Sequence, residues 1–228
     1  MNKKIAALVS IFAIAVTGNA LALETQTGSS YQVDTDALDA FDCGEDFKWE
    51  QLPNGGAGVA AQDDECYPFL AESADNFVGD GEMMIGAGWW GDWDGSAMLD
   101  AFEITIYADS GNGPGEMIYT EVVTDYNETA GAPFGYCALL SEPVMKADGE
   151  TYWIDITSIY CFQPQWFWSV GDGDGQEIYF KSDFFGFPDW VPGSIVFGGP
   201  RETAFLLYNE GGGVPTEEAT WSEIKALY

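Results

Sequence analysis

Three tryptophans and two aspartates stand within one short stretch of the chain, residues 88–95. They are Trp89, Trp90, Asp92, Trp93 and Asp94. The C–H faces of a sugar ring stack on indole rings, and carboxylate oxygens accept hydrogen bonds from sugar hydroxyl groups. This composition predicts a carbohydrate-binding platform, with Trp93 in a loop. The alternative is that the indoles cover the ends of a sheet. Because Trp89 and Trp90 face opposite sides in a strand, one of them is expected in the core.

A second cluster, at residues 171–177, offers oxygen ligands to calcium. Asp172 and Asp174 are two residues apart between glycines that allow close backbone approach, and Glu177 follows. Calcium prefers such carboxylate and carbonyl oxygens. The spacing of the later ligands differs from that of an EF-hand, and no helix pattern flanks the cluster. Calcium is therefore the one cofactor that the sequence suggests. The alternative interpretation of residues 171–177 is an acidic hairpin tip that is exposed to solvent and binds no ion.

The chain contains no histidine. This composition excludes the Ser-His-Asp and Cys-His nucleophile systems and the histidine-rich zinc and iron sites. Two facing carboxyl groups would suffice for glycoside hydrolysis. Among 38 Asp and Glu residues, however, nothing in the sequence distinguishes a catalytic pair. We therefore expect no enzyme activity.

The beginning of the sequence has the pattern of a secretory signal peptide. Lys3 and Lys4 precede an apolar run over residues 5–16, and Ala20-Leu21-Ala22 predicts cleavage after residue 22. Removal of the two lysines would change the net charge from −31 to −33. Such a charge repels nucleic acid and anionic lipid surfaces and attracts divalent cations. Solubility, or adaptation to high salt, is an equally simple reason for it. No later segment is long and apolar enough to cross a membrane.

Four cysteines in an exported chain predict two disulfide bonds. Three pairings are possible. We favour the pairing that is local in sequence, Cys43–Cys66 and Cys137–Cys161, because each bond would then connect one loop or strand pair. The cysteines do not suggest a metal site, since no CxxC motif and no histidine accompanies them.

Short aromatic or β-branched runs separated by Gly, Pro, Asn and Asp indicate an all-β fold from about residue 41. Phe102, Ile104 and Ile106 alternate with polar residues in the clearest strand, 102–107, which a turn over 108–115 connects to a return strand at 117–123. Further strands are expected at 83–90, 134–140, 151–157, 165–170, 177–181, 194–197 and 204–208. We predict a two-sheet antiparallel β-sandwich of about nine strands.

The organisation along the chain follows from these patterns. We expect a signal peptide at 1–22, a polar leader at 23–40, the sandwich domain at 41–210, and a Gly/Pro spacer with a short helical tail at 211–228. A capping-box pattern over 220–223 begins the helix. Because an isolated helix of this length is only marginally stable, it must dock on its own domain or on a receptor that recognises it as a sorting signal.

Several segments resemble a group of uncharacterised secreted β-sandwich domains of bacterial surface proteins. The resembling segments are 73–77, 88–93, 102–109 with 113–115, 149–154 and 204–208. The resemblance covers roughly residues 45–209 and implies a jelly-roll-like sandwich at the bacterial cell surface or outside the cell. It brings no catalytic residues with it. The tail resembles a short sorting signal, without the apolar span and basic cluster of the better known kind.

Three hypotheses for function follow. The first is an exported, non-catalytic binding or adhesion module for polysaccharide or for other surface proteins. The second is a calcium-dependent structural component of a cell surface or extracellular matrix. The third is a glycoside hydrolase. The oligomeric state does not follow from the sequence.

Overall fold

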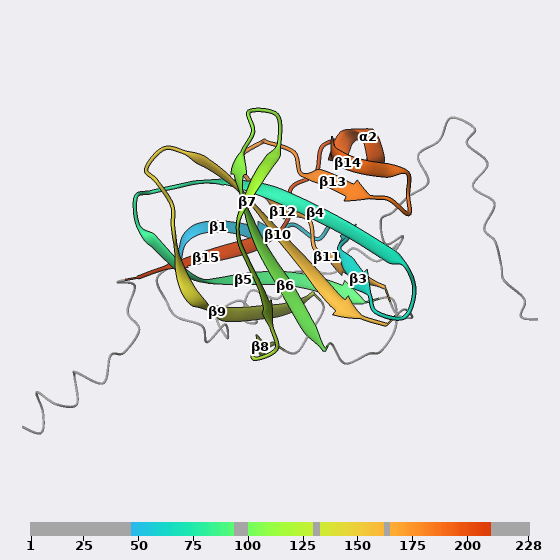
Figure 1. The fold of residues 1–228 in the computed structure, drawn as a ribbon, viewed down its shortest axis with the longest axis horizontal. Coiled ribbons are helices and arrows are strands. Elements are labelled where there is room, and N and C mark those ends of the chain that lie inside the picture. Colours follow the sequence, from blue (N-terminus) through green and yellow to red (C-terminus); the bar gives the residue numbers. More distant parts are fainter. Residues whose placement is uncertain (1–46, 94–99, 130–132, 162–164, 211–228) are drawn as a thin grey trace, which may run out of the picture.

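The computed structural model describes residues 47–93, 100–129, 133–161 and 165–210, and it consists of two β-sheets packed face to face (Figure 1). The eight-stranded sheet contains β12 (Gly171–Asp172), β1 (Phe47–Pro53), β15 (Phe205–Asn209), β5 (Met83–Trp93), β11 (Trp166–Trp168) and β2 (Val59–Ala60) in that order, with β9 (Phe134–Met145) on β5 and β8 (Asn127–Glu128) on β9. The seven-stranded sheet contains β14 (Phe187–Pro192), β13 (Tyr179–Ser182), β4 (Phe69–Val78), β3 (Gln62–Asp64), β10 (Thr151–Tyr160), β6 (Ala101–Asp109) and β7 (Pro114–Val123).

This architecture confirms the all-β sandwich. Phe102, Ile104 and Ile106 of β6 are fully buried, as their alternation with polar residues predicts, and β6 forms an antiparallel hairpin with β7. The described residues contain fifteen strands rather than about nine, because the sheets include several short strands of two or three residues. One pair is parallel rather than antiparallel: β3 lies beside β10 with Gln62 opposite Ser158.

The core between the sheets is rich in aromatic rings. Its largest fully buried side chains include Trp89, Trp166, Trp168, Phe102 and Phe205. The rings meet mostly edge to face; those of Trp89 and Phe102, for example, lie 4.8 Å apart at 75°. That arrangement suits the aromatic quadrupole and contributes stabilisation beyond the area buried. The sandwich is therefore held together by apolar packing despite its acidic composition.

The expected strand over 194–197 is wrong, because this segment forms the short helix α2 (Gly193–Phe197) beside β13 and β14 (Figure 1). The Glu177 carboxylate accepts hydrogen bonds from the Ser194 backbone N–H at 2.6 Å and from the Ser194 hydroxyl at 3.0 Å. A carboxylate that accepts from N–H groups of the first turn stabilises a helix at that end. Gly198, at φ +75°, ends the helix, so local backbone chemistry and a contact from a distant acidic residue both favour it.

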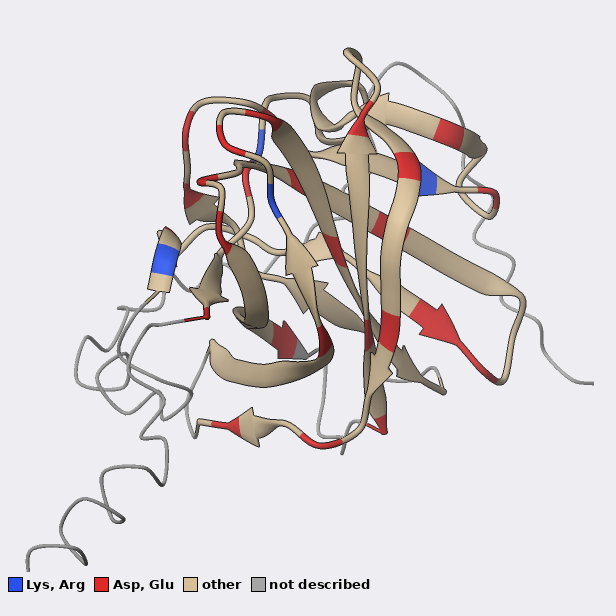
Figure 2. Cartoon of the chain, turned by 60° about the vertical axis from the view of Figure 1, so that its left-hand side comes forward, with Lys and Arg blue, Asp and Glu red and all other residues tan. Residues whose placement is uncertain are grey.

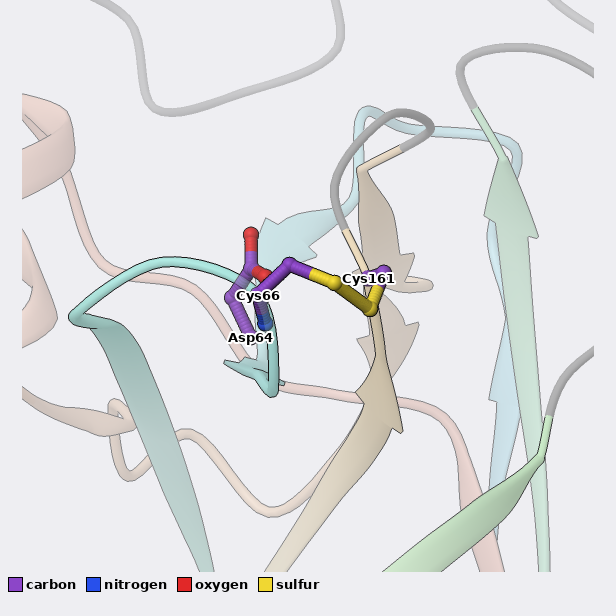
Figure 3. Close-up of side chains that lie close together, drawn as sticks. All are labelled: Asp64, Cys66 and Cys161. Carbon is purple, nitrogen blue, oxygen red and sulfur yellow. Dashed lines mark hydrogen bonds between the residues drawn. A yellow bond between two sulfur atoms is a disulfide. The ribbon is translucent and has the colours of Figure 1, made fainter.

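Both predicted disulfide pairs are wrong, because Cys66 is bonded to Cys161 (Figure 3). The parallel pairing of β3 with β10 puts Asp64 opposite Tyr160, so the cysteines that follow these strands meet at one sheet end with Cα atoms 5.1 Å apart. Asp64 Oδ1 accepts hydrogen bonds from the N–H groups of Cys66 and Tyr67 and shapes the turn between them. Cys137 is also disulfide-bonded, whereas Cys43 lies outside the described residues.

Candidate functional site

The predicted tryptophan platform contributes to two buried clusters. Trp89 has no exposed surface, and its ring stacks on Tyr136 with centroids 6.0 Å apart. Trp90 is 3% exposed and packs on the opposite face of β5, in a cluster with Leu206 and Tyr208. Both faces of β5 are covered, so neither indole offers a face to a sugar. Asp92 is half-buried; the side chain of Trp93 and all of Asp94 lie outside the described residues.

Two adjoining clefts instead open where loops of the two sheets meet: segments next to β1, β12 and β15 of the eight-stranded sheet line the first, and residues of β6, β10 and β13 of the seven-stranded sheet help to line the second. The first has a volume of about 740 Å³. It is lined by Asn54, Gly56, Ala57, Val170, Gly171, Asp172, Gly173, Asp174, Gly175, Pro200, Arg201 and Glu202. The loop after β12 and the segment before β15 form its walls, and an isolated bridge between Val170 and Thr203 keeps them together.

The structure separates the three predicted calcium ligands. Asp172 and Asp174 are exposed in the first cleft, where Asp172 Oδ1 accepts a hydrogen bond from Asn54 Nδ2 at 3.0 Å. Glu177 is not with them, since its carboxylate is bound to Ser194 at the start of α2. Glu202 takes its place beside the two aspartates.

The Glu202 carboxylate is enclosed by the Gly-Asp-Gly turn of residues 173–175. Its Oε1 atom accepts a hydrogen bond from the Gly175 N–H at 3.0 Å, and Oε2 lies so close to the Gly173 backbone that any Cβ atom there would collide with it. Burial raises the pKa of the Glu202 carboxyl; hydrogen bonds from the backbone of Gly175 and Asp174 oppose that rise, and the charges of Asp174 and Asp172 add to it. The first cleft thus gathers three carboxylates, together with one cationic residue, Arg201, in its lining.

Beneath this cleft, the carboxyl group of Asp75 connects the two sheets through the core. Its Oδ2 atom accepts hydrogen bonds from Gln51 Nε2 of β1 at 3.0 Å and from the hydroxyl of Thr203 at 2.9 Å. Burial raises the pKa of Asp75 to about 7, although these hydrogen bonds favour the ionised form. Asp75 therefore holds the Thr203 segment, and with it Glu202, against β4.

The second cleft has a volume of about 380 Å³ and shares Gly175 and Pro200 with the first. It is lined by Asp109, Gly111, Asn112, Gly113, Thr151, Trp153, Gly175, Gln176, Glu177, Tyr179 and Pro200. Trp153 Nε1 donates a hydrogen bond to Asp109 Oδ1 at 2.9 Å, and the half-buried Tyr179 ring meets Trp153 edge to face at 5.0 Å. Gly113, at φ +109°, lies directly on the Tyr179 ring. This cleft therefore combines aromatic surface with carboxylate and amide groups.

A third acidic group, which sequence reasoning missed, lies on the outer face of the seven-stranded sheet. Asp155 of β10 is 3% exposed, and burial raises the pKa of its carboxyl well above the usual range, with a further rise from the charge of Glu72. Glu72 in turn forms an ion pair with Lys181 at 2.7 Å. Neither Asp155 nor Glu72 lines either of the two clefts. We therefore assign both residues to the packing of the sheet.

Acidic residues are distributed over the strands and loops of both sheets, with few Lys or Arg residues among them (Figure 2). The spacing of Asp172 and Asp174 was the only sequence signal for the first cleft. No sequence signal pointed to Glu202. It reaches the first cleft because β15, near the end of the described chain, pairs with β5 in the middle of the sheet. Tyr179 and Asp109 gave none either, since their juxtaposition depends on the order of strands in the sheet.

No protein-family model matches the chain, and comparisons with curated proteins and with solved structures find no similar protein. The resemblance to secreted bacterial surface domains therefore stays a prediction. In the described part of the chain, no helix has the length and apolar character needed to cross a membrane. The predicted signal peptide, polar leader and C-terminal tail all lie outside the described residues.

Proposed function

We propose that this chain is an exported, non-catalytic binding module for polysaccharide, and that the sugar binds in the second cleft rather than on Trp89 and Trp90. The single observation that carries this proposal is the Tyr179 ring, half-buried in a cleft with Asp109, Asn112 and Gln176. An aromatic surface beside convergent polar groups is the usual composition of a site for a hydroxyl-rich ligand.

The polar groups of this cleft suit binding better than hydrolysis. The Asp109 carboxylate accepts from Trp153 Nε1 and from the Gly111 N–H, and Glu177 is bound to Ser194. A glycosidase needs one protonated carboxyl group and one free carboxylate facing the scissile bond. Carboxylates held by donors of their own chain are instead fixed acceptors, which orient sugar hydroxyl groups without entering the chemistry.

The Cys66–Cys161 disulfide supports export, because such bonds persist in oxidising compartments. The excess of Asp and Glu over Lys and Arg, coloured along the chain in Figure 2, further argues against nucleic acid and anionic membranes as partners. Neutral polysaccharide, which carries no repelling charge, remains a suitable ligand class.

The test is affinity electrophoresis and titration calorimetry against a panel of soluble polysaccharides. Wild type is expected to bind at least one neutral glycan, and Tyr179→Ala should weaken that binding about tenfold or more through loss of the aromatic surface. Tyr67→Ala is the matched control, since Tyr67 is 60% exposed and lines neither cleft. Absence of binding by wild type to every glycan, or equal loss in both variants, would refute the proposal.

A further inference from the structure

We propose that Lys146 and Asn209 form an intramolecular isopeptide bond, and that the Asp80 carboxylate carries the protons for this reaction. The Nζ atom of Lys146 becomes joined to the side-chain carbonyl carbon of Asn209, and the amide nitrogen of Asn209 leaves as ammonium. The bond cross-links the residue that follows β9 to the last residue of β15, at a sequence separation of 63. This reaction takes place within the chain and does not depend on the proposed sugar-binding surface.

The three residues meet at the start of β5, which lies between β9 and β15 in the eight-stranded sheet (Figure 1). Lys146 directly follows β9, Asn209 ends β15, and Asp80 stands in the loop before β5. The Gly81 N–H donates to the Lys146 carbonyl at 2.9 Å, and the Lys146 N–H donates to the Glu82 carbonyl at 3.3 Å. Main-chain hydrogen bonds therefore hold the lysine backbone against the loop that contains Asp80.

The Lys146 amine is in contact with both groups that the reaction requires. Its Nζ atom lies 2.7 Å from Asn209 Oδ1 and 2.8 Å from Asp80 Oδ1. Among the Lys and Arg residues that the structure describes, Lys146 alone is buried, and Asn209 is only 1% exposed. The carbon atom that Nζ attacks is bonded to Asn209 Oδ1, so the amine and the amide are already held together. Holding two reactants in contact replaces their encounter in solution and lowers the barrier to reaction.

The neighbours of Asn209 also fix which way its amide points. Its Nδ2 atom donates to Asp80 Oδ2 at 2.6 Å and to Glu82 Oε2 at 2.9 Å, so two carboxylates accept from this nitrogen. The reversed amide would set its oxygen against both carboxylates and its nitrogen against the ammonium group of Lys146, where no hydrogen bond can form. The carbonyl oxygen therefore faces the lysine, whose N–H polarises the carbonyl group, and the leaving nitrogen faces the acids.

Asp80 is placed to carry protons from the attacking nitrogen to the leaving nitrogen, because its Oδ1 atom accepts from Lys146 and its Oδ2 atom accepts from Asn209. The carboxylate takes one proton from the ammonium group, the neutral Nζ bonds to the amide carbon, and the bond from that carbon to Nδ2 breaks. Nζ loses two protons in total and Nδ2 gains two, so Asp80 ends ionised, as it began. Burial raises the pKa of Asp80, but hydrogen bonds from Lys146 and Asn209 lower it to about 2. The first proton transfer is therefore uphill, and we expect cross-linking to be slower than folding.

The test is mass spectrometry of the purified, folded chain after incubation, followed by reduction and proteolysis. Wild type should be lighter than its sequence requires by the mass of one ammonia molecule. Digestion should release one branched peptide that contains both Lys146 and Asn209, and trypsin should no longer cleave after Lys146. A cyclic imide at Asn209 would lose the same mass without joining two peptides, so the branched peptide is the deciding observation.

Three variants test the roles of the residues. Lys146→Arg keeps a positive charge beside Asp80 but has no primary amine, so it should keep its full mass and give no branched peptide. Asp80→Asn keeps the size of the side chain but removes the proton acceptor, and it should slow cross-linking about a hundredfold or more. Glu142→Gln removes a charge at an exposed site on β9 and should cross-link as wild type does. The proposal is overturned if wild type yields Lys146 and Asn209 in separate peptides, with or without loss of ammonia, or if Asp80→Asn cross-links as fast as Glu142→Gln.

Discussion

The Thr203 backbone N–H donates a hydrogen bond to the Asp75 carboxyl group across the interior of the sandwich, with nitrogen and oxygen 2.5 Å apart. These residues are separated by 128 positions and belong to segments of opposite sheets. Asp75 is fully buried, so this contact is shielded from water. One polar contact therefore ties the wall of the first cleft to the seven-stranded sheet.

Asp75 predicts a characteristic pH dependence of stability. Its pKa is about 7 in the folded protein, against 3.8 as the ordinary value. Between pH 3.8 and pH 7 the folded state binds a proton that the unfolded state lacks. The stabilising contribution of this protonated carboxyl group is therefore complete below pH 3.8 and is lost as the pH rises through 7. The loss amounts to at most about 4 kcal/mol of unfolding free energy.

Urea denaturation in chelator at a series of pH values measures this effect. Asp75→Asn should be less stable than wild type at pH 4, by about 2 kcal/mol, because an amide nitrogen would face one of the donors. The difference between the two proteins should shrink as the pH rises toward 8. Parallel stability curves for wild type and variant would show that Asp75 does not titrate in this range.

Trp89→Ala tests whether this ring is structural. Because Trp89 is fully buried against Phe102 and Tyr136, its truncation should lower the unfolding free energy by about 3–5 kcal/mol. Any glycan bound by wild type should still be bound by the folded fraction of the variant. Loss of glycan binding without loss of stability would return Trp89 to the role that the sequence first suggested.

Glu177→Gln tests the contact between this carboxylate and the first turn of α2. The change weakens the hydrogen bonds to Ser194, so we expect a loss of about 1–2 kcal/mol in unfolding free energy. Urea denaturation measures this loss, and an unfolding free energy equal to that of wild type would show that the contact does not stabilise the helix.

The Cys66–Cys161 bond predicts both a peptide map and a stability loss. Proteolysis without reduction should release a peptide pair that contains these two cysteines. Replacing both by serine opens a loop with a sequence separation of 95 residues and should cost about 4.7 kcal/mol by the loop-entropy argument. Recovery of a peptide that joins Cys43 to Cys66 would contradict the structure directly.

Local pattern was enough to predict the class of fold. Alternation along Phe102, Ile104 and Ile106 is dictated by the two-residue period of a strand, and the turn after it is dictated by its Gly and Pro content. Both signals act between neighbours in sequence. The same reasoning failed at 194–197, where the structure has a short helix whose first turn is bound by a carboxylate 17 positions away.

The sequence by itself determined that this is an acidic all-β protein with an aromatic core and that Asp172 and Asp174 share one loop. Only the tertiary structure decided that both Trp89 and Trp90 are buried, that Cys66 meets Cys161, and that Glu202 joins Asp174. The physical reason is that composition and period act locally, whereas the neighbours of a side chain across the sandwich depend on the order in which strands pair. Strand order is fixed by the packing of the whole core, so no short stretch of sequence contains it.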